Sequence, residues 1–364
     1  MIYRHLTPRL TVFLLAGLLS AAGSLHAFSL AEEISGHSPS PDVLPVRNPD
    51  NFEQVMGSLI DTGVLLIPES TNDRVMAFDP ATGDLIDPDF IPADPVNLST
   101  PIQAILAADQ NSILVSDQLE DLVQQYDLAG NYLGVFAPAG GVDTNILDNV
   151  RGIALDGNNN LLVTVGGGGN DDAIAQFDTS GNFLGNFVAN GAGGLDSPFD
   201  VIPTAAGEFL VGGINSDNLM RYDGTGSYLA DLSSIDTFPE QLYQMTNGNF
   251  LVGNFTGTEE GVVEYTSTGT LVGIYDPVSL GGYRGVYELE NGNILTTNGS
   301  GVHEIDRTGN LVETKISGVS ARFITFVQAG SPEPPAPVPG ISFWGLMVLI
   351  LLLMGLTLRF RHTA

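Results

Sequence analysis

The sequence of 364 residues contains no cysteine, and its 42 Asp and Glu residues far outnumber its 12 Lys and Arg residues. Without cysteine there can be no disulfide bond, no thiolate nucleophile and no cysteine-ligated metal. The formal net charge of -30 argues against nucleic acid as a partner, because nucleic-acid phosphates are bound mainly by Lys and Arg. Such an acidic surface suits a solvated exterior, so we expect packing and hydrogen bonds alone to hold the fold.

The first 27 residues have the order of features found in a secretory signal peptide. Arg4 and Arg9 precede an apolar run from Val12 to Leu19, and small residues then lead to Ala27. This order predicts export and cleavage after Ala27. Residues 28–50 contain four prolines and no apolar period, which predicts a flexible lead-in.

The other end combines a proline-rich spacer with a hydrophobic segment. The prolines of residues 329–340 lack amide hydrogens and disfavour a helix, so the spacer should be extended. Residues 341–358 are 18 residues without a charge, long enough for one transmembrane helix. Arg359 and Arg361 follow in the basic end, 359–364, which should face the cytoplasm. We therefore predict an exported domain that residues 341–358 hold to the membrane.

This tail resembles the sorting tails of PEP-CTERM proteins, in which a short proline-containing motif, one hydrophobic helix and a basic cluster follow one another. The residues Pro-Glu-Pro that start at Pro332 spell that motif. The segment Val338–Gly345 is also similar to the IPTL-CTERM variant, from which it departs at Gly340 and Phe343. The resemblance implies a sorting or processing membrane enzyme as a partner, with release after processing as one outcome. The alternative is an ordinary single-pass anchor.

A repeat runs through the middle of the chain. Its mark is a large apolar residue followed by Asp or Thr, and these dipeptides are Phe78-Asp79, Tyr126-Asp127, Phe177-Asp178, Tyr222-Asp223, Tyr265-Thr266 and Ile305-Asp306. They lie 40 to 51 residues apart, a period that is typical of propeller blades. Most are followed by a Gly-containing turn, in which Asp accepts backbone amides and Gly supplies a positive φ.

Each repeat contains four short apolar strand patterns, the composition of an antiparallel blade. We therefore predict an all-β fold, a six-bladed β-propeller over residues 51–328. The innermost strands are expected at Ile102–Ala107, Gly152–Leu155, Phe199–Ile202, Leu242–Met245, Gly285–Leu289 and Arg322–Val327. The last of these has no blade after it, so it should close the ring by pairing into the first blade. A competing choice for that position is Phe52–Met56.

The repeat unit resembles the NHL-type propeller repeat. The resemblance is carried by Arg151-Gly-Ile-Ala-Leu-Asp-Gly-Asn-Asn-Asn-Leu-Leu-Val and Gln176-Phe-Asp-Thr-Ser-Gly-Asn-Phe-Leu-Gly, and it extends over about residues 62–328. NHL-like propellers include binding modules as well as some lyases and lactonases. The resemblance therefore implies the fold and leaves the function open.

Three of the few cationic side chains occupy the same aligned position in the predicted inner strands. Alignment of the strands places together Ile102, Arg151, Phe199, Glu240, Arg284 and Arg322. We predict that the three arginines bind an anionic or carboxylate-bearing ligand at the channel mouth. The side chains expected to complete this polar ring are Asp200, Glu240 and Gln103. The alternative is that the arginines pair with the two acids or with backbone carbonyls of neighbouring blades and only fill the channel.

The sequence contains no catalytic constellation. His303 is the only histidine between Asp50 and Phe360, and it is expected on a third strand, away from the channel. The lyases of this fold group use several histidines and a metal. Lactonase-type propellers hold a cation with Glu, Asn and Asp, and Glu240 with Asp200 could serve, but neighbouring arginines disfavour a cation there. We assign no catalytic residue, no metal and no cofactor.

These features favour a noncatalytic propeller that is displayed at the cell envelope or in an extracellular matrix and binds a protein, polysaccharide or small ligand. A second hypothesis is a hydrolase or lyase, of lactonase type, at the channel mouth with Glu240 or Asp200 as its base. A third is a structural matrix component.

Overall fold

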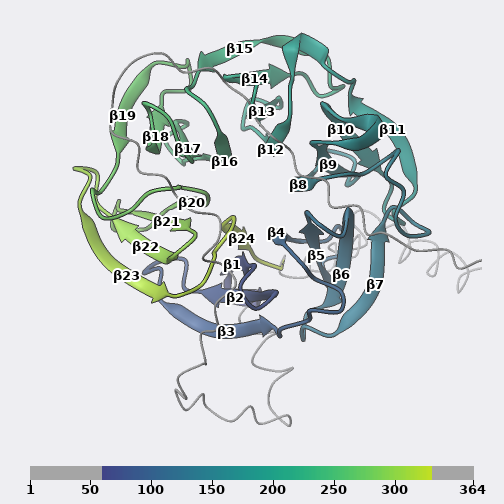
Figure 1. Cartoon of the computed structure of the whole chain (residues 1–364), viewed down its shortest axis with the longest axis horizontal. Coiled ribbons are helices and arrows are strands. Elements are labelled where there is room, and N and C mark those ends of the chain that lie inside the picture. Colours follow the sequence, from purple (N-terminus) through teal and green to yellow (C-terminus); the bar gives the residue numbers. More distant parts are fainter. Residues whose placement is uncertain (1–59, 330–364) are drawn as a thin grey trace, which may run out of the picture. The chain divides into compact units, whose positions relative to one another are not determined.

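The computed structural model describes residues 60–329, which form six four-stranded antiparallel sheets arranged as a ring (Figure 1). The predicted all-β, six-bladed propeller is confirmed. Within this described range, none of the helices has the length and apolar character needed to cross a membrane. The predicted signal peptide, lead-in, transmembrane segment 341–358 and basic end, like residues 330–340 of the spacer, lie outside the described residues.

Each blade has an inner strand at the channel and an outer strand at the circumference (Figure 1). From the inside outward, the first two blades consist of β24 (Thr325–Val327), β1 (Val64–Glu69), β2 (Arg74–Phe78) and β3 (Leu85–Ile91), then β4 (Pro101–Leu106), β5 (Ser112–Asp117), β6 (Leu122–Asp127) and β7 (Tyr132–Ala137). The next two consist of β8 (Val150–Leu155), β9 (Leu161–Val165), β10 (Ala173–Phe177) and β11 (Phe183–Val188), then β12 (Pro198–Pro203), β13 (Phe209–Gly213), β14 (Asn218–Tyr222) and β15 (Tyr228–Ser234).

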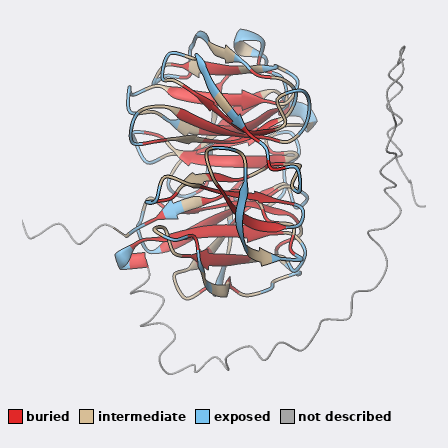
Figure 2. Ribbon diagram, turned by 90° about the vertical axis from the view of Figure 1, so that its left-hand side faces the viewer, coloured by how far each residue is buried: buried red, intermediate tan, exposed pale blue. Residues whose placement is uncertain are grey.

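The last two blades follow the same order. They consist of β16 (Pro239–Gln244), β17 (Phe250–Asn254), β18 (Gly261–Tyr265) and β19 (Leu271–Tyr275), then β20 (Val286–Glu288), β21 (Ile294–Asn298), β22 (Gly301–Ile305) and β23 (Leu311–Ser317). Two short 3-10 turns, η1 (Gly168–Asn170) and η2 (Ala192–Gly194), lie in connections between strands. The second and third strands of each blade are mostly buried, and the turns at both rims are exposed (Figure 2).

The end of the described chain closes the ring, as predicted. β24 pairs antiparallel with β1, with Val64 opposite Val327 and Leu66 opposite Thr325. This strand is shorter than the predicted Arg322–Val327, because its ladder with β1 is interrupted. The Arg322 amide still donates to the Pro68 carbonyl of β1 at 2.9 Å, but the Phe323 amide donates to the Ile102 carbonyl of the second blade at 3.1 Å. The first blade therefore contains both ends of the described chain, and β24 covers the inner edge of β1.

The repeated dipeptides are the points where successive blades interlock. In the third blade Phe177 is fully buried, and the Asp178 carboxylate accepts the Asn182 amide at 2.9 Å to fix the turn. Gly181 in this turn has φ of +76°, and a Cβ there would lie 1.7 Å from the carbonyl oxygen of Phe136 in the preceding blade. Only glycine tolerates both conditions, so the turn sets the distance between the two blades.

The ring closure predicts that a substitution near the end of the chain destabilises the whole domain. Val327 is 3% exposed in the core of the first blade, whereas its neighbour Phe326 is 43% exposed. Val327→Ala should lower the free energy of unfolding by about 1–3 kcal/mol, measured by urea denaturation. Phe326→Ala, the matched control, should have a clearly smaller effect. Equal effects would mean that β24 is not part of the cooperative core.

Candidate functional site

The starts of the inner strands bring four of the six predicted site residues to one end of the channel. Arg151 lies in β8 and Glu240 in β16, while Arg284 and Arg322 lie just before β20 and β24. The positive charges of all three arginines act on the Glu240 carboxyl group and favour its ionised form. We call these four residues the arginine layer. Residues that are far apart in sequence thus meet here because the aligned repeat positions face one channel.

Each arginine donates a hydrogen bond to the hydroxyl group of a serine in an adjoining loop. Arg151 Nη1 donates to Ser197 Oγ at 2.9 Å and to the carbonyl of Pro198 at 3.0 Å, and Arg284 Nη1 donates to Ser320 Oγ at 2.7 Å. Both serines stand two residues before the aligned position of the next blade. Arg322 has Ser70 Oγ among its partners, at 3.0 Å from Nη2. Arg151 thus binds backbone carbonyls of the neighbouring blade, while Arg284 and Arg322 bind serine hydroxyls.

Aromatic rings lie beside the arginine layer. The guanidinium carbon of Arg151 is 4.6 Å from the ring centroid of Phe199, and that of Arg284 is 5.6 Å from the ring centroid of Phe255. Phe238 contacts both of these rings, with centroids 5.8 Å and 5.2 Å away. Stacking on aromatic faces fixes the planes of the two guanidinium groups and replaces part of their lost hydration.

The arginine layer contains buried polar atoms without partners. In the described part of the chain the other cationic side chains are in ion pairs: Arg74 with Glu69 and Asp89, Arg221 with Glu208, Arg307 with Glu264 and Glu288, and Lys315 with Asp84, Glu304 and Glu313. By contrast, Arg151 and Arg284 form no ion pair within 4.0 Å in residues 60–329. The Nε atoms of both arginines are buried and have no hydrogen-bonding partner among residues 60–329. The same is true of Oε2 of Glu240.

Burial also shifts the ionisation of this layer. Glu240 is 3% exposed, and burial raises its pKa to about 7 even though the three arginines act in the opposite direction. Burial lowers the pKa of Arg151 to about 10, and the nearby Glu240 partly opposes this shift. Guanidinium groups are charged at neutral pH, whereas burial opposes the ionisation of Glu240. The layer therefore carries a net positive charge in a chain that is otherwise strongly acidic.

Asp200 does not face the arginines as an ion-pair partner. It is fully buried on β12, where Oδ1 accepts the Val201 amide and Oδ2 accepts the Leu242 amide of the next blade, both at 2.8 Å. The pairing of β16 with β17 shifts register just before Leu242, so the side chain binds an amide at a β-bulge. Burial raises the pKa of Asp200 to about 7, against the opposing effect of the two amides.

Gln103 has the same bridging role on β4. Its Oε1 accepts the Ile153 amide of the next blade at 2.7 Å, and its Nε2 lies 3.4 Å from Thr325 Oγ1 of β24. Gln241 on β16 accepts the amides of Val286 and Ile324 in the same way, at 2.9 Å and 2.8 Å. Gln241 was not among the site residues predicted from the sequence. Asp200, Gln103 and Gln241 thus form a bridging layer that joins the inner strands.

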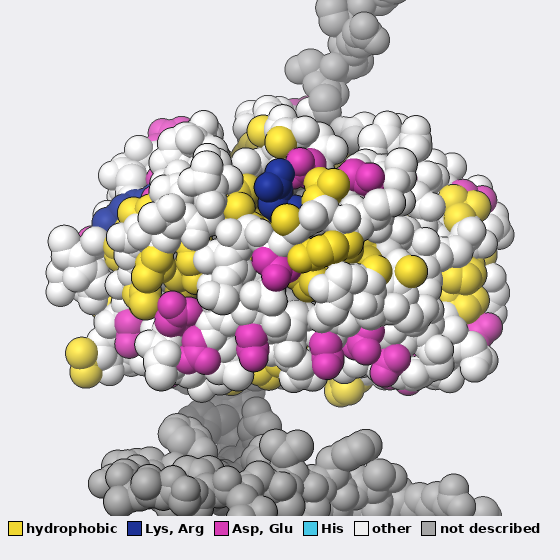
Figure 3. All heavy atoms as spheres, turned by 90° about the horizontal axis from the view of Figure 1, so that it is seen from above, with side chains coloured by type: hydrophobic (Ala, Val, Ile, Leu, Met, Phe, Trp, Pro, Cys, Tyr) yellow, Lys and Arg dark blue, Asp and Glu magenta, His cyan; other side chains and the backbone are white. Residues whose placement is uncertain are grey.

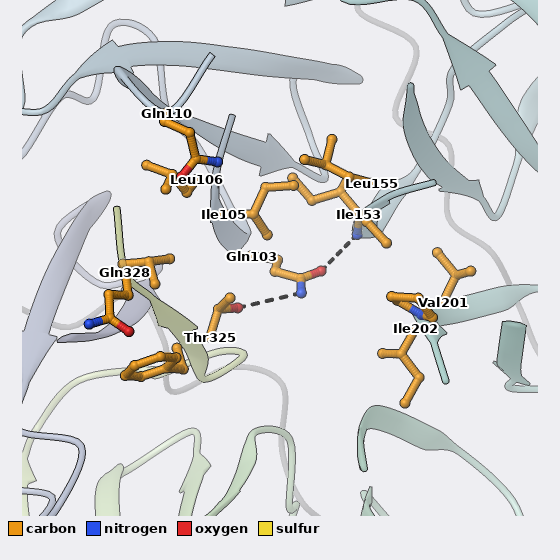
Figure 4. A pocket seen from close by; sticks show the side chains of 14 residues that line it. Gln103, Ile105, Leu106, Gln110, Ile153, Leu155, Val201, Ile202, Thr325 and Gln328 are labelled. Carbon is orange, nitrogen blue, oxygen red and sulfur yellow. Dashed lines mark hydrogen bonds between the residues drawn. The ribbon is translucent and has the colours of Figure 1, made fainter. Parts of the chain in front are cut away.

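Gln103 also lines a cavity of about 340 Å³ that lies further along the channel (Figure 4). The cavity is formed by the later residues of β4, β8 and β12 together with the segment Thr325–Gln328. The arginine layer lies at the opposite ends of these inner strands. The predicted ring of six residues is therefore divided among the arginine layer, the bridging layer and the wall of this cavity.

His303 lies on β22, the third strand of its blade, where sequence analysis expected it. It is 3% exposed, and its ring nitrogens lie 3.1 Å from Asn298 Oδ1 and from Thr314 Oγ1. Burial lowers its pKa. Among residues 60–329, no group of three or more His, Asp or Glu side chains has an arrangement that could hold a metal ion.

The buried acid of the bridging layer should make stability depend on pH. Because the folded-state pKa of Asp200 is raised from about 4 to about 7, the folded protein binds its proton more tightly, and this contribution to stability is lost as the pH rises through that window. Asn has no carboxyl group to titrate, so the stability of Asp200→Asn does not fall over this pH range. The variant does leave one backbone amide without its oxygen acceptor, which costs about 1–3 kcal/mol. The destabilisation by Asp200→Asn, from urea unfolding at pH 5 and pH 8, should therefore be larger at pH 5.

Asp223→Asn is the matched control, because the pKa of this exposed turn carboxyl is lowered and the group stays ionised above pH 5 in both states. Its effect on unfolding should be equal at pH 5 and pH 8. A pH-independent effect of Asp200→Asn would contradict the assignment of a raised pKa to Asp200.

Comparison with known proteins supports the fold. No family model matches the sequence, and neither does any curated protein. Among solved structures, a protein of unknown function from Bacteroides caccae is 16% identical with a TM-score of 0.52, and the match covers 73% of this chain and 98% of that one. A gluconolactonase from Xanthomonas campestris is 17% identical with a TM-score of 0.54, over 71% of this chain and 90% of that one.

A chain in the crystal structure of a nidogen–laminin complex is 14% identical with a TM-score of 0.56, over 73% of this chain and 99% of that one. Such low identities establish similarity of fold alone. The protein is thus a six-bladed β-propeller, and the solved structures that it resembles include a gluconolactonase and a chain of a nidogen–laminin complex.

Proposed function

We propose that the protein is a noncatalytic β-propeller that binds carboxylate-bearing ligands at the channel mouth. The observation that carries this proposal is the state of Arg151 and Arg284. Both side chains keep a buried Nε–H without a partner, and neither forms an ion pair within residues 60–329, although the chain has an excess of carboxylates. A buried guanidinium group is stabilised when a carboxylate accepts its N–H groups.

Glu240 narrows the class of ligand. Its unpartnered Oε2 can accept a hydrogen bond from a ligand hydroxyl, while the arginines hold a carboxylate. A carboxylate with hydroxyl groups beside it, as in a uronic acid, satisfies both kinds of group at once. Such sugar acids occur in extracellular polysaccharides, so the ligand class suits a protein that is displayed outside the cell.

Export and display are part of the same proposal. The sequence patterns that predict a signal peptide at 1–27 and a sorting tail at 329–364 support this part of the proposal: export, attachment through residues 341–358 and recognition of the tail by a membrane-embedded sorting or processing enzyme. The acidic surface supports a solvated exterior. Acidic side chains are spread along one rim in the side view of the ring in Figure 3. Nucleic acid is not an expected ligand on such a surface.

A second candidate function is lactone hydrolysis at the same end of the channel. The observation that favours it is Glu240, whose buried carboxyl group has a pKa of about 7 and one oxygen without a partner. A carboxylate with this pKa could act as a general base at neutral pH. The three arginines make it an unfavourable ligand for a cation, so a metal-dependent lactonase mechanism does not suit this layer.

The binding proposal predicts that glucuronate binds more tightly than glucose, measured by isothermal titration calorimetry. The two sugars differ in the carboxylate, so a preference of at least about tenfold for glucuronate is expected from its charge-assisted hydrogen bonds. Arg284→Met should lower the glucuronate affinity by about tenfold or more, because it removes a donor while keeping an extended apolar side chain.

Arg221→Met is the matched control, since Arg221 lies on β14 and pairs with Glu208 away from the channel mouth. Glucuronate affinity should be unchanged in this variant. Equal losses in both arginine variants would point to a general effect of charge and would contradict a site at the channel mouth.

The catalytic alternative is tested by the hydrolysis of gluconolactone between pH 6 and pH 8, with the uncatalysed rate subtracted. The binding proposal predicts no rate above that background for the wild type or for Glu240→Gln. A wild-type rate that rises through about pH 7, as the base loses its proton, and that Glu240→Gln abolishes would establish the lactonase function instead.

A further inference from the structure

The cavity beyond the bridging layer is distinct from the arginine layer. It begins at Gln103 and extends past Ile105, Ile153 and Val201 to the ends of the inner strands. Residues such as Leu155 and Ile202 stand three to four positions after the aligned starts of their strands, or about 10–13 Å along the channel. A ligand in the arginine layer would therefore not occupy this cavity.

The wall of the cavity contains no ionisable side chain. Its fourteen residues are Gln103, Ile105, Leu106, Gln110, Ile153, Ala154, Leu155, Val201, Ile202, Pro203, Thr325, Phe326, Val327 and Gln328. Ten of these are apolar and four carry an amide or a hydroxyl group. In a chain with 42 acidic residues, an uncharged wall of this kind offers nothing to compensate the desolvation of an ionic ligand.

Two of the four polar side chains of the wall, Gln103 and Thr325, lie next to each other. Gln103 reaches between the strands to Thr325, and Figure 4 shows the two side chains joined by a hydrogen bond. The Gln103 amide has a second N–H, and the Thr325 hydroxyl can donate as well as accept. Aliphatic side chains of Ile105, Leu155 and Ile202 face the same space. The arrangement suits an apolar molecule with one neutral hydrogen-bonding group.

We propose that this cavity is a second binding site, independent of the arginine layer, for uncharged amphipathic molecules with a short alkyl body and an amide, carbonyl or hydroxyl group. Its volume of about 340 Å³ falls in the range of small-ligand pockets. The alkyl body packs on the aliphatic wall, and the neutral group bonds to Gln103 and Thr325. A carboxylate or an ammonium group on the same alkyl chain is excluded because its charge would have no partner.

Three probes of equal chain length test this proposal: hexanamide, hexanoate and hexylammonium. They are titrated into the full-length protein in lipid nanodiscs, without detergent, and their affinities are measured by saturation-transfer NMR, with empty nanodiscs as the blank. Hexanamide should bind at about 1 mM or tighter. It should bind at least tenfold more tightly than either charged probe. Hexanoate or hexylammonium within threefold of hexanamide, or no binding of hexanamide, would overturn the proposal.

Substitutions of the half-buried Leu155 separate this site from nonspecific binding. Leu155→Trp fills the cavity and should lower hexanamide affinity at least tenfold, while Leu155→Lys should reverse the preference in favour of hexanoate. Leu133→Trp, on the exposed face of outer strand β7, is the control and should leave all three affinities unchanged. Urea unfolding confirms that each variant is folded. Unchanged hexanamide binding in a folded Leu155→Trp variant would overturn the proposal.

Discussion

Neighbouring blades are joined by apolar clusters between their sheets and, along the channel, by hydrogen bonds between their inner strands. Backbone ladders join strands within each sheet, and the chain has no cysteine that could cross-link one sheet to another. Buried Asp200, Gln103 and Gln241 supply these connections by accepting amides of the adjoining inner strands. Two of those amides, of Leu242 and Ile153, follow shifts in strand register, where the regular ladder is interrupted. The structural role of these three polar channel residues is thus to join the inner strands of neighbouring blades.

The same framework is compatible with the ligand binding that we propose for the arginine layer. The serines and aromatic rings at the mouth use only part of the donor capacity of Arg151 and Arg284, and these bonds fix the guanidinium groups before any ligand arrives. A preorganised donor set loses little conformational entropy on binding. Guanidinium groups that are held in place but keep an unpartnered Nε–H are therefore compatible with anion recognition. Arginines with every N–H group paired would only stabilise the fold.

The repeats made the fold predictable, while the roles of channel side chains depended on geometry. The dipeptide period and the turn glycines predicted six blades, and the surplus strand at Arg322–Val327 predicted the closure. The alignment also predicted that Arg151, Glu240 and Arg284 share one end of the channel. It could not predict that Asp200 binds two amides instead of an arginine, because the register shifts that present those amides leave no mark in the sequence. Nor could it reveal the cavity beyond Gln103, whose wall comes from ordinary apolar strand residues.

The central claim is that the arginine layer recognises a carboxylate through Nε–H groups that the protein leaves without a partner. It is tested most directly by NMR of the arginine Nε–Hε signals of Arg151 and Arg284, assigned through single substitutions, during a titration with glucuronate. The account predicts that both signals shift together and saturate with one affinity, while the signal of ion-paired Arg221 stays in place. Signals of Arg151 and Arg284 that do not move at saturating glucuronate would contradict it and leave these arginines as braces of the ring.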